Sequence, residues 1–121
     1  FHADSGIIVA NNASLVVNGL PSNTDALENE VIFEGDRLET DFSEVAGQWG
    51  TIWLTNGSHS NVLNNLTIKN AVIGLYVNGN DGTGAVNTTL NNVQIYNCSN
   101  IGLFATTGFV DGKNVVINNC G

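Results

Sequence analysis

The chain has 121 residues, the length of a single domain, and a formal net charge of −8 from 11 acidic and three basic side chains. Three basic residues cannot neutralise many phosphates. We therefore expect neither nucleic acid nor an anionic membrane surface as a partner. No run of eighteen apolar residues occurs, and we therefore expect no membrane span in this segment. Abundant Gly and Asn, a single Pro and no helical period predict an all-β fold.

Short apolar runs with a period of two predict strands along the whole chain. In each run the first and third residues face a core and the middle residue points outward. The predicted runs are residues 7–9, 15–17, 31–33, 52–54, 66–68, 75–77, 93–95, 103–105 and 115–117. Three polar loops are expected between them, at residues 20–30, 36–47 and 78–88, and residues 1–121 read as one domain.

One pattern occurs three times in the second half of the chain. NNLTIKNA (64–71) is followed by NNVQIYNC (91–98) and KNVVINNC (113–120), with an offset of 27 residues from Leu66 to Val93 and of 22 from Val93 to Val115. A copy of this length cannot bury its own apolar face, so it must stack on its neighbours. Stacked copies place equivalent residues about 4.8 Å apart, which predicts a parallel β-helix of about four coils.

The recurring turn asparagines follow the same logic. Asn70, Asn97 and Asn119 hold equivalent places in the three copies, so they are expected to stack. A side-chain amide both donates and accepts, so stacked asparagines can form a hydrogen-bonded ladder beside the core.

The repeat resembles that of the right-handed parallel β-helix family, which includes polysaccharide lyases and many bacterial surface proteins. Within residues 31–121, VIFEGD (31–36) and GQWGTIWL (47–54) resemble a strand–loop–strand pattern of large surface lipoproteins of Bacteroidetes-type bacteria. The resemblance implies an extracellular place on the bacterial cell surface. Both ends of the chain fall inside coils and no capping segment is visible, so we interpret the chain as an uncapped piece of a longer protein, with any lipid anchor in a missing N-terminal segment.

Acidic residues gather between positions 28 and 44. A calcium site is one interpretation, because hard cations take several oxygen ligands, and a carboxylate pair for glycoside hydrolysis is another. A solvated loop on an acidic protein is the third, and the spacing matches no twelve-residue calcium loop. The candidate calcium ligands are Glu34, Asp36, Glu39 and Asp41. No other cofactor is expected.

Three aromatic residues take the outward position in equivalent runs: Trp53, Tyr76 and Phe104, with Ile8 in the earlier coil. We expect them to form a column on one outer face. Such a column suits sugar rings or an apolar protein partner, unless residues 36–47, with Phe42, cover it.

Cys98 and Cys120 hold equivalent places, one coil apart, where the first copy has Ala71. The spacing allows a disulfide, and two stacked thiols that act as small apolar residues are the alternative.

These observations predict a non-catalytic surface protein that contacts glycans, adheres to cells or assembles with outer-membrane or other cell-surface proteins. A polysaccharide lyase or glycosidase with catalytic residues partly outside this segment is the alternative. No catalytic residue is assigned, because the few basic residues form no pair with an acidic set.

Overall fold

The computed structural model describes residues 1–79 and 86–121, which form β-strands and no helix. The strands are β1 (Ile7–Val9), β2 (Val16–Asn18), β3 (Val31–Phe33), β4 (Ile52–Leu54), β5 (Asn61–Lys69), β6 (Ile73–Asn78), β7 (Thr88–Tyr96), β8 (Ile101–Thr106) and β9 (Val110–Asn118). In the described part of the chain, no helix is long and apolar enough to cross a membrane. The predicted loop at residues 78–88 joins β6 to β7, and its residues 80–85 lie outside the described part.

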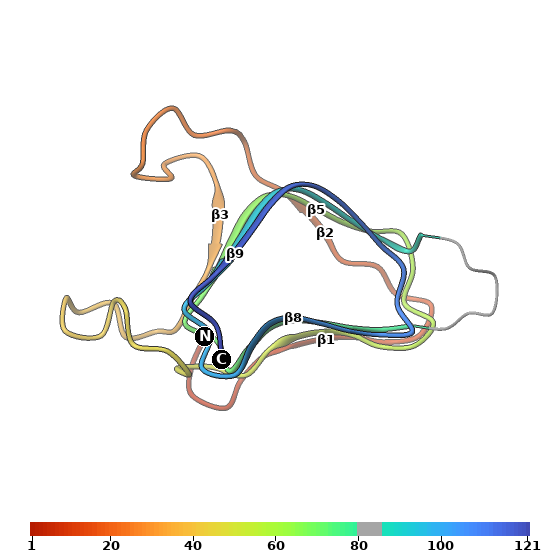
Figure 1. The fold of residues 1–121 in the computed structure, drawn as a ribbon, viewed down its shortest axis with the longest axis horizontal. Helices are drawn as coiled ribbons and strands as arrows, with labels where there is room; N and C mark the ends of the chain where they lie inside the picture. The colour runs from red at the N-terminus through yellow and green to blue at the C-terminus, as the bar shows by residue number, and fades with distance from the viewer. Residues whose placement is uncertain (80–85) are drawn as a thin grey trace.

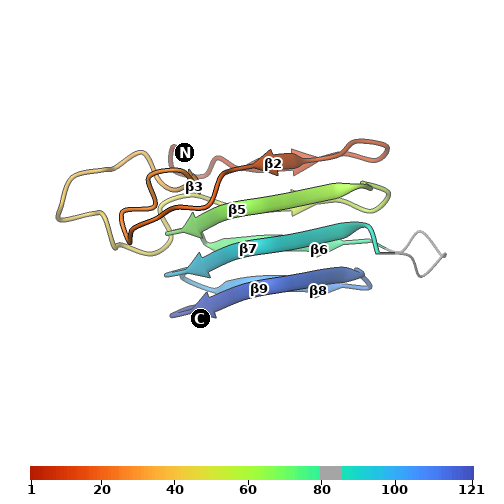
Figure 2. The same ribbon diagram turned by 90° about the horizontal axis from the view of Figure 1, so that it is seen from above.

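The strands pair in parallel in two sheets, ordered β1-β4-β6-β8 and β2-β5-β7-β9, with β3 also paired to β5. Viewed end-on, successive passes of the chain superpose in a three-sided outline (Figure 1). Viewed from the side, they stack in chain order from β2 to β9 (Figure 2). We call one pass through both sheets a coil, so β4–β5, β6–β7 and β8–β9 are the second, third and fourth coils. This all-β arrangement is compatible with a solenoid.

The long strands β5, β7 and β9 each bend in the middle. The bend falls at Asn65, Asn92 and Asn114, whose φ angles are 47°, 51° and 54°, a left-handed conformation that Asn tolerates better than most residues. In the first coil the same path is split, because β2 pairs with the first half of β5 and β3 with its second half. Residues 20–30 are inserted at that bend. The runs predicted at residues 66–68, 93–95 and 115–117 were therefore too short.

The predicted inward register is confirmed. Ile68, Ile95 and Ile117 are strand partners in one ladder, and Leu75 and Leu103 are partners in another. Ile68, Ile95 and Leu75 are fully buried, and each such side chain contributes about 1.5–3 kcal/mol by leaving water. Ile117 keeps the register but is 47% exposed, because β9 is the edge strand of its sheet.

Trp49 is a core residue that the sequence pattern did not reveal. It is fully buried, bridges to Ala71 in the next coil, and donates from Nε1 to the Lys69 carbonyl at 2.8 Å. The Phe1 ring stacks on it at 4.4 Å between centroids. Trp49 therefore occupies, just before β4, the corner position that Ala71 takes before β6 and Cys98 takes before β8.

Candidate functional site

The outer face of the sheet β1-β4-β6-β8 carries a continuous column of side chains. Ile8, Trp53, Tyr76 and Phe104 are strand partners in successive coils. The Trp53 and Tyr76 rings stack with centroids 5.6 Å apart and planes 6° apart, and the Tyr76 and Phe104 rings stack at 4.9 Å and 23°. We call these four residues the aromatic column. It arises because the alternation that buries Leu75 and Val77 forces Tyr76 outward.

Stacking, not a loop, shields the middle of the aromatic column. Trp53 and Tyr76 are half-buried between their neighbours, whereas the ends are open, with Ile8 67% and Phe104 40% exposed. Residues 36–47 extend from the corner near the chain ends and not across this face (Figure 1). Phe42 packs instead under the Arg37 guanidinium, 3.4 Å from the ring centroid. The column is therefore accessible along its outer side.

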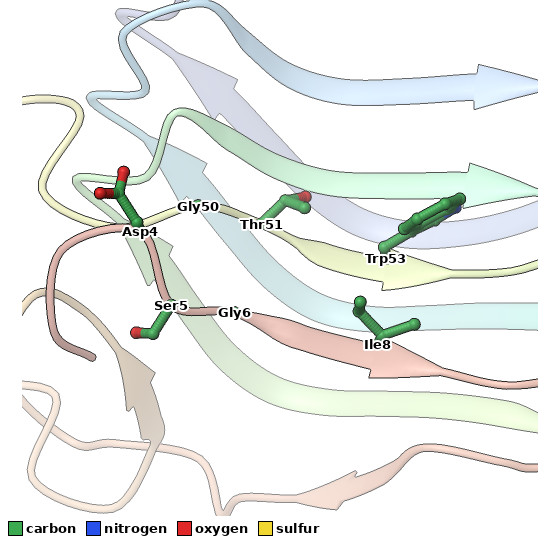
Figure 3. Close-up of a pocket in the computed structure, with 7 residues that line it drawn as sticks. All are labelled: Asp4, Ser5, Gly6, Ile8, Gly50, Thr51 and Trp53. Carbon is green, nitrogen blue, oxygen red and sulfur yellow. The ribbon is translucent and has the colours of Figure 1, made fainter.

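A small hollow lies at the Ile8 end of the aromatic column. Its volume is about 170 Å³, and Figure 3 shows the Ile8 and Trp53 side chains on neighbouring strands beside it. A Cβ on Gly6 would lie 2.5 Å from the Thr51 carbonyl oxygen, so no larger residue fits there. The indole Nε1 of Trp53 is buried and has no hydrogen-bond acceptor. The lining residues are Asp4, Ser5, Gly6, Ile8, Gly50, Thr51 and Trp53.

The predicted asparagine ladder lies at a corner of the stack. Asn97 donates from Nδ2 to Asn70 Oδ1 at 2.8 Å, and Asn119 donates to Asn97 Oδ1 at 2.9 Å. All three have positive φ, between 50° and 60°. Two of the same amides also donate outward, to the carbonyls of Ser43 at 2.8 Å and Glu44 at 2.7 Å. The ladder thus fastens residues 36–47 to this corner.

A second asparagine ladder runs through the bend of the long strands, and sequence reasoning missed it. Asn114 donates to Asn92 Oδ1 at 2.8 Å, Asn92 to Asn65 Oδ1 at 3.0 Å, and Asn65 to the Gly19 carbonyl at 2.8 Å. The available signal was the Asn that recurs immediately before each inward pair, which is the position of a left-handed bend. The first ladder satisfies polar groups beside the core, whereas Asn92 and Asn114 of the second are exposed.

The acidic residues of positions 28–44 do not converge on one point. Glu34 and Glu44 both contact Lys69, at 3.5 and 3.1 Å, and Glu30 accepts from the buried Thr67 hydroxyl. Of the other calcium candidates, Asp36 contacts His2 at 2.7 Å, Glu39 lies 3.8 Å from Arg37, and Asp41 is exposed. Among the described residues, no group of three or more His, Cys, Asp or Glu side chains is placed to hold a metal ion.

Lys69 is the most enclosed basic residue of the three. Burial lowers the pKa of its ammonium, but a hydrogen bond to Glu44 and the charges of Tyr96, Glu44 and Glu34 outweigh burial and raise the pKa overall. The group is therefore held in its charged form. Its ion pair with Glu44 links β5 to residues 36–47. Because the ammonium is already protonated, it is poorly suited to remove a proton.

Cys98 and Cys120 are stacked free thiols. Burial, followed by the charge of Cys120 and a hydrogen bond with it, raises the pKa of the Cys98 thiol to about 12. Each sulfur lies against a glycine of the other sheet, since a Cβ on Gly74 would come within 3.2 Å of Cys98 Sγ and one on Gly102 within 3.0 Å of Cys120 Sγ. The described geometry is that of small apolar residues filling a corner.

Comparison with models of known protein families, with curated proteins and with solved structures found no match.

Proposed function

We propose that this chain is a non-catalytic recognition segment of a right-handed parallel β-helix protein on a bacterial cell surface. Its ligand in this proposal is a surface glycan, which it contacts through the aromatic column. Adhesion and assembly with outer-membrane proteins are the settings in which such contact would operate.

The observation that carries the proposal is the unbroken stack of Trp53, Tyr76 and Phe104 on an outer face that no loop among residues 1–79 and 86–121 crosses. Large aromatic side chains at the surface are unfavourable in water unless something covers them, so an exposed row of them marks a contact surface. Because the rings stack on one another, they present mainly their edges. Aromatic edges carry partial positive charge and attract oxygen atoms such as those of sugar hydroxyls.

The surroundings of the column support a polar, uncharged ligand. Beyond Tyr76 and Phe104, the next outward positions on the same strands are Asn78 and Thr106, which are themselves strand partners. Amide and hydroxyl groups beside aromatic rings supply both hydrogen-bond donors and acceptors. This pairing of apolar edges with neutral polar groups matches the mixed surface of a sugar better than that of a charged ligand.

A lyase or glycosidase is less well supported by the described residues. A lyase of this fold needs a basic group to remove a proton beside a sugar carboxylate. Lys69 is the enclosed candidate, and its two ion pairs hold it protonated. We therefore rank recognition above catalysis.

The test is a glycan array probed with the labelled chain and with Tyr76→Ser. Phe109→Ser is the control, because Phe109 is an aromatic residue that is exposed, at 43%, and lies outside the column. We expect Tyr76→Ser to lose glycan binding while Phe109→Ser retains it, with both variants folded by circular dichroism. Equal binding by all three proteins, or release of unsaturated sugars by the wild-type chain, would contradict the proposal.

A further inference from the structure

A second, larger hollow lies away from the aromatic column, between the N-terminal segment and residues 36–47. Its volume is about 510 Å³, within the range of pockets that hold small molecules. Figure 1 shows residues 36–47 and the N-terminus at the same corner of the three-sided outline. We call this hollow the loop pocket. It is lined by His2, Ala3, Asp36, Arg37, Phe42, Val45, Ala46, Gly47 and Gln48.

The walls of the loop pocket are held in place before any ligand arrives. The side-chain amide of Gln48 donates to the backbone carbonyls of Phe42 and Val45. The backbone N–H of Asp36 donates to the Phe1 carbonyl at 2.7 Å. The asparagine ladder holds the same loop from behind through the Ser43 and Glu44 carbonyls. A preformed pocket loses little conformational freedom on binding, so modest contacts are enough for measurable affinity.

One side of the loop pocket is apolar and the other is polar. Ala3, Phe42, Val45 and Ala46 supply the apolar side. On the polar side, His2 Nδ1 lies 2.7 Å from Asp36 Oδ2, and Arg37 lies flat on Phe42. A guanidinium stacked on a ring keeps its in-plane N–H groups free to donate, and the neighbouring Glu39 carboxylate is 3.8 Å away.

We propose that the loop pocket binds one neutral sugar unit, with Asp36 accepting and Arg37 donating hydrogen bonds to adjacent hydroxyls. The carbon-bound hydrogens of the sugar would then contact Phe42, Val45 and Ala46. Charge selects the neutral class, because the Arg37 cation already lies 3.8 Å from the Glu39 carboxylate and the pocket already holds a second carboxylate, Asp36, which is paired with His2. An acidic sugar would bring a third carboxylate to a chain whose net charge is −8.

The test is nuclear magnetic resonance titration of the 121-residue chain with neutral hexoses and with the matching uronic acids. Arg37→Gln removes the donor, and Ala46→Phe fills the pocket. We expect saturable shifts at residues 36–48 with a neutral hexose, and affinity about tenfold weaker in Arg37→Gln, the effect of losing one charged hydrogen bond. Ala46→Phe should abolish binding. Asp41→Asn, an exposed carboxylate of the same loop outside the pocket, should bind like the wild type.

Three results would overturn the inference. They are tighter binding of the uronic acids, no shift at residues 36–48 with any neutral hexose, and unchanged affinity in Arg37→Gln. Arg37 is over half exposed, so this variant keeps the test valid if Ala46→Phe does not fold. Tyr76→Ser separates the two sites, because it should leave binding at the loop pocket intact whether or not the aromatic column recognises glycans.

Discussion

The third and fourth coils carry the same short repeat in two different environments. In the third coil, Ile95 is fully buried and Cys98 is 2% exposed, and both have a coil on either side. In the fourth, Ile117 keeps the same register and is 47% exposed, and Asn119 is exposed as well. The residue pattern therefore sets the direction in which a side chain points, and the number of neighbouring coils sets how much of it leaves water.

The largest expected effect concerns the inner ladder. Ile95→Ala should lower the free energy of unfolding by about 2–5 kcal/mol, because it leaves a cavity between two coils. Ile117→Ala should cost only about 1 kcal/mol, because about half of that side chain is already in water. Urea unfolding followed by circular dichroism measures both values. Equal losses would mean that the two coils are equally enclosed in solution.

The asparagine ladder should show the same asymmetry. Asn97→Gly keeps the left-handed backbone but removes bonds to Asn70 and Glu44, so it should cost about 1–3 kcal/mol for the buried groups left without partners. Asn119→Gly removes one bond at an exposed position and should cost less than about 1 kcal/mol. Thermal unfolding of the two variants, compared with the wild type, measures the two losses of stability. A larger loss of stability in Asn119→Gly than in Asn97→Gly would contradict this prediction.

The aromatic column offers a smaller contrast. Tyr76 stacks on two rings and Phe104 on one, and each stacked pair is worth about 0.5–1.5 kcal/mol beyond its buried area. Tyr76→Ser should therefore destabilise the chain more than Phe104→Ser, by about one pair's contribution. Denaturant midpoints measured side by side would show this, and a larger loss in Phe104→Ser would place the main support of the column at the sheet edge.

The smallest contrast is between the two thiols. At pH 8 Cys120, which is partly exposed, should react with a disulfide reagent, while Cys98 should react only after unfolding, since its pKa of about 12 leaves almost no thiolate. The pKa of the Cys98 thiol in the folded chain is raised above its ordinary value of 9.0, so the Cys98 contribution to stability is complete below pH 9 and is lost as pH rises toward 12. Unfolding of the wild type and Cys98→Ala across this window measures the loss. Equal labelling rates for both thiols in the folded chain would contradict the burial of Cys98.

Several features were predictable because they depend on local alternation. The pairing of Val31 and Phe33 with the later inward residues, and the outward column, follow from a period of two combined with the repeat. Trp49 was not predictable in the same way, because it lies outside any alternating run and is buried by Phe1, which is distant in sequence. The asparagine pattern predicted one ladder, whereas the second depended on a bend inside strands that the short apolar runs did not reveal.

The residues alone were sufficient to assign the inward and outward faces of the strands, the strand partners and the number of residues per coil. Strand alternation is a local rule, and each copy of the repeat follows it in the same way. The position of residues 36–47 followed from the folded chain, because these residues have no repeat and their carbonyls attach to Asn70 and Asn97 across long sequence separations. That attachment keeps residues 36–47 away from the aromatic column and forms the loop pocket. The folded chain also set the degree of burial, since Ile95 and Ile117 have the same residue type and register and differ in whether another coil lies beyond them.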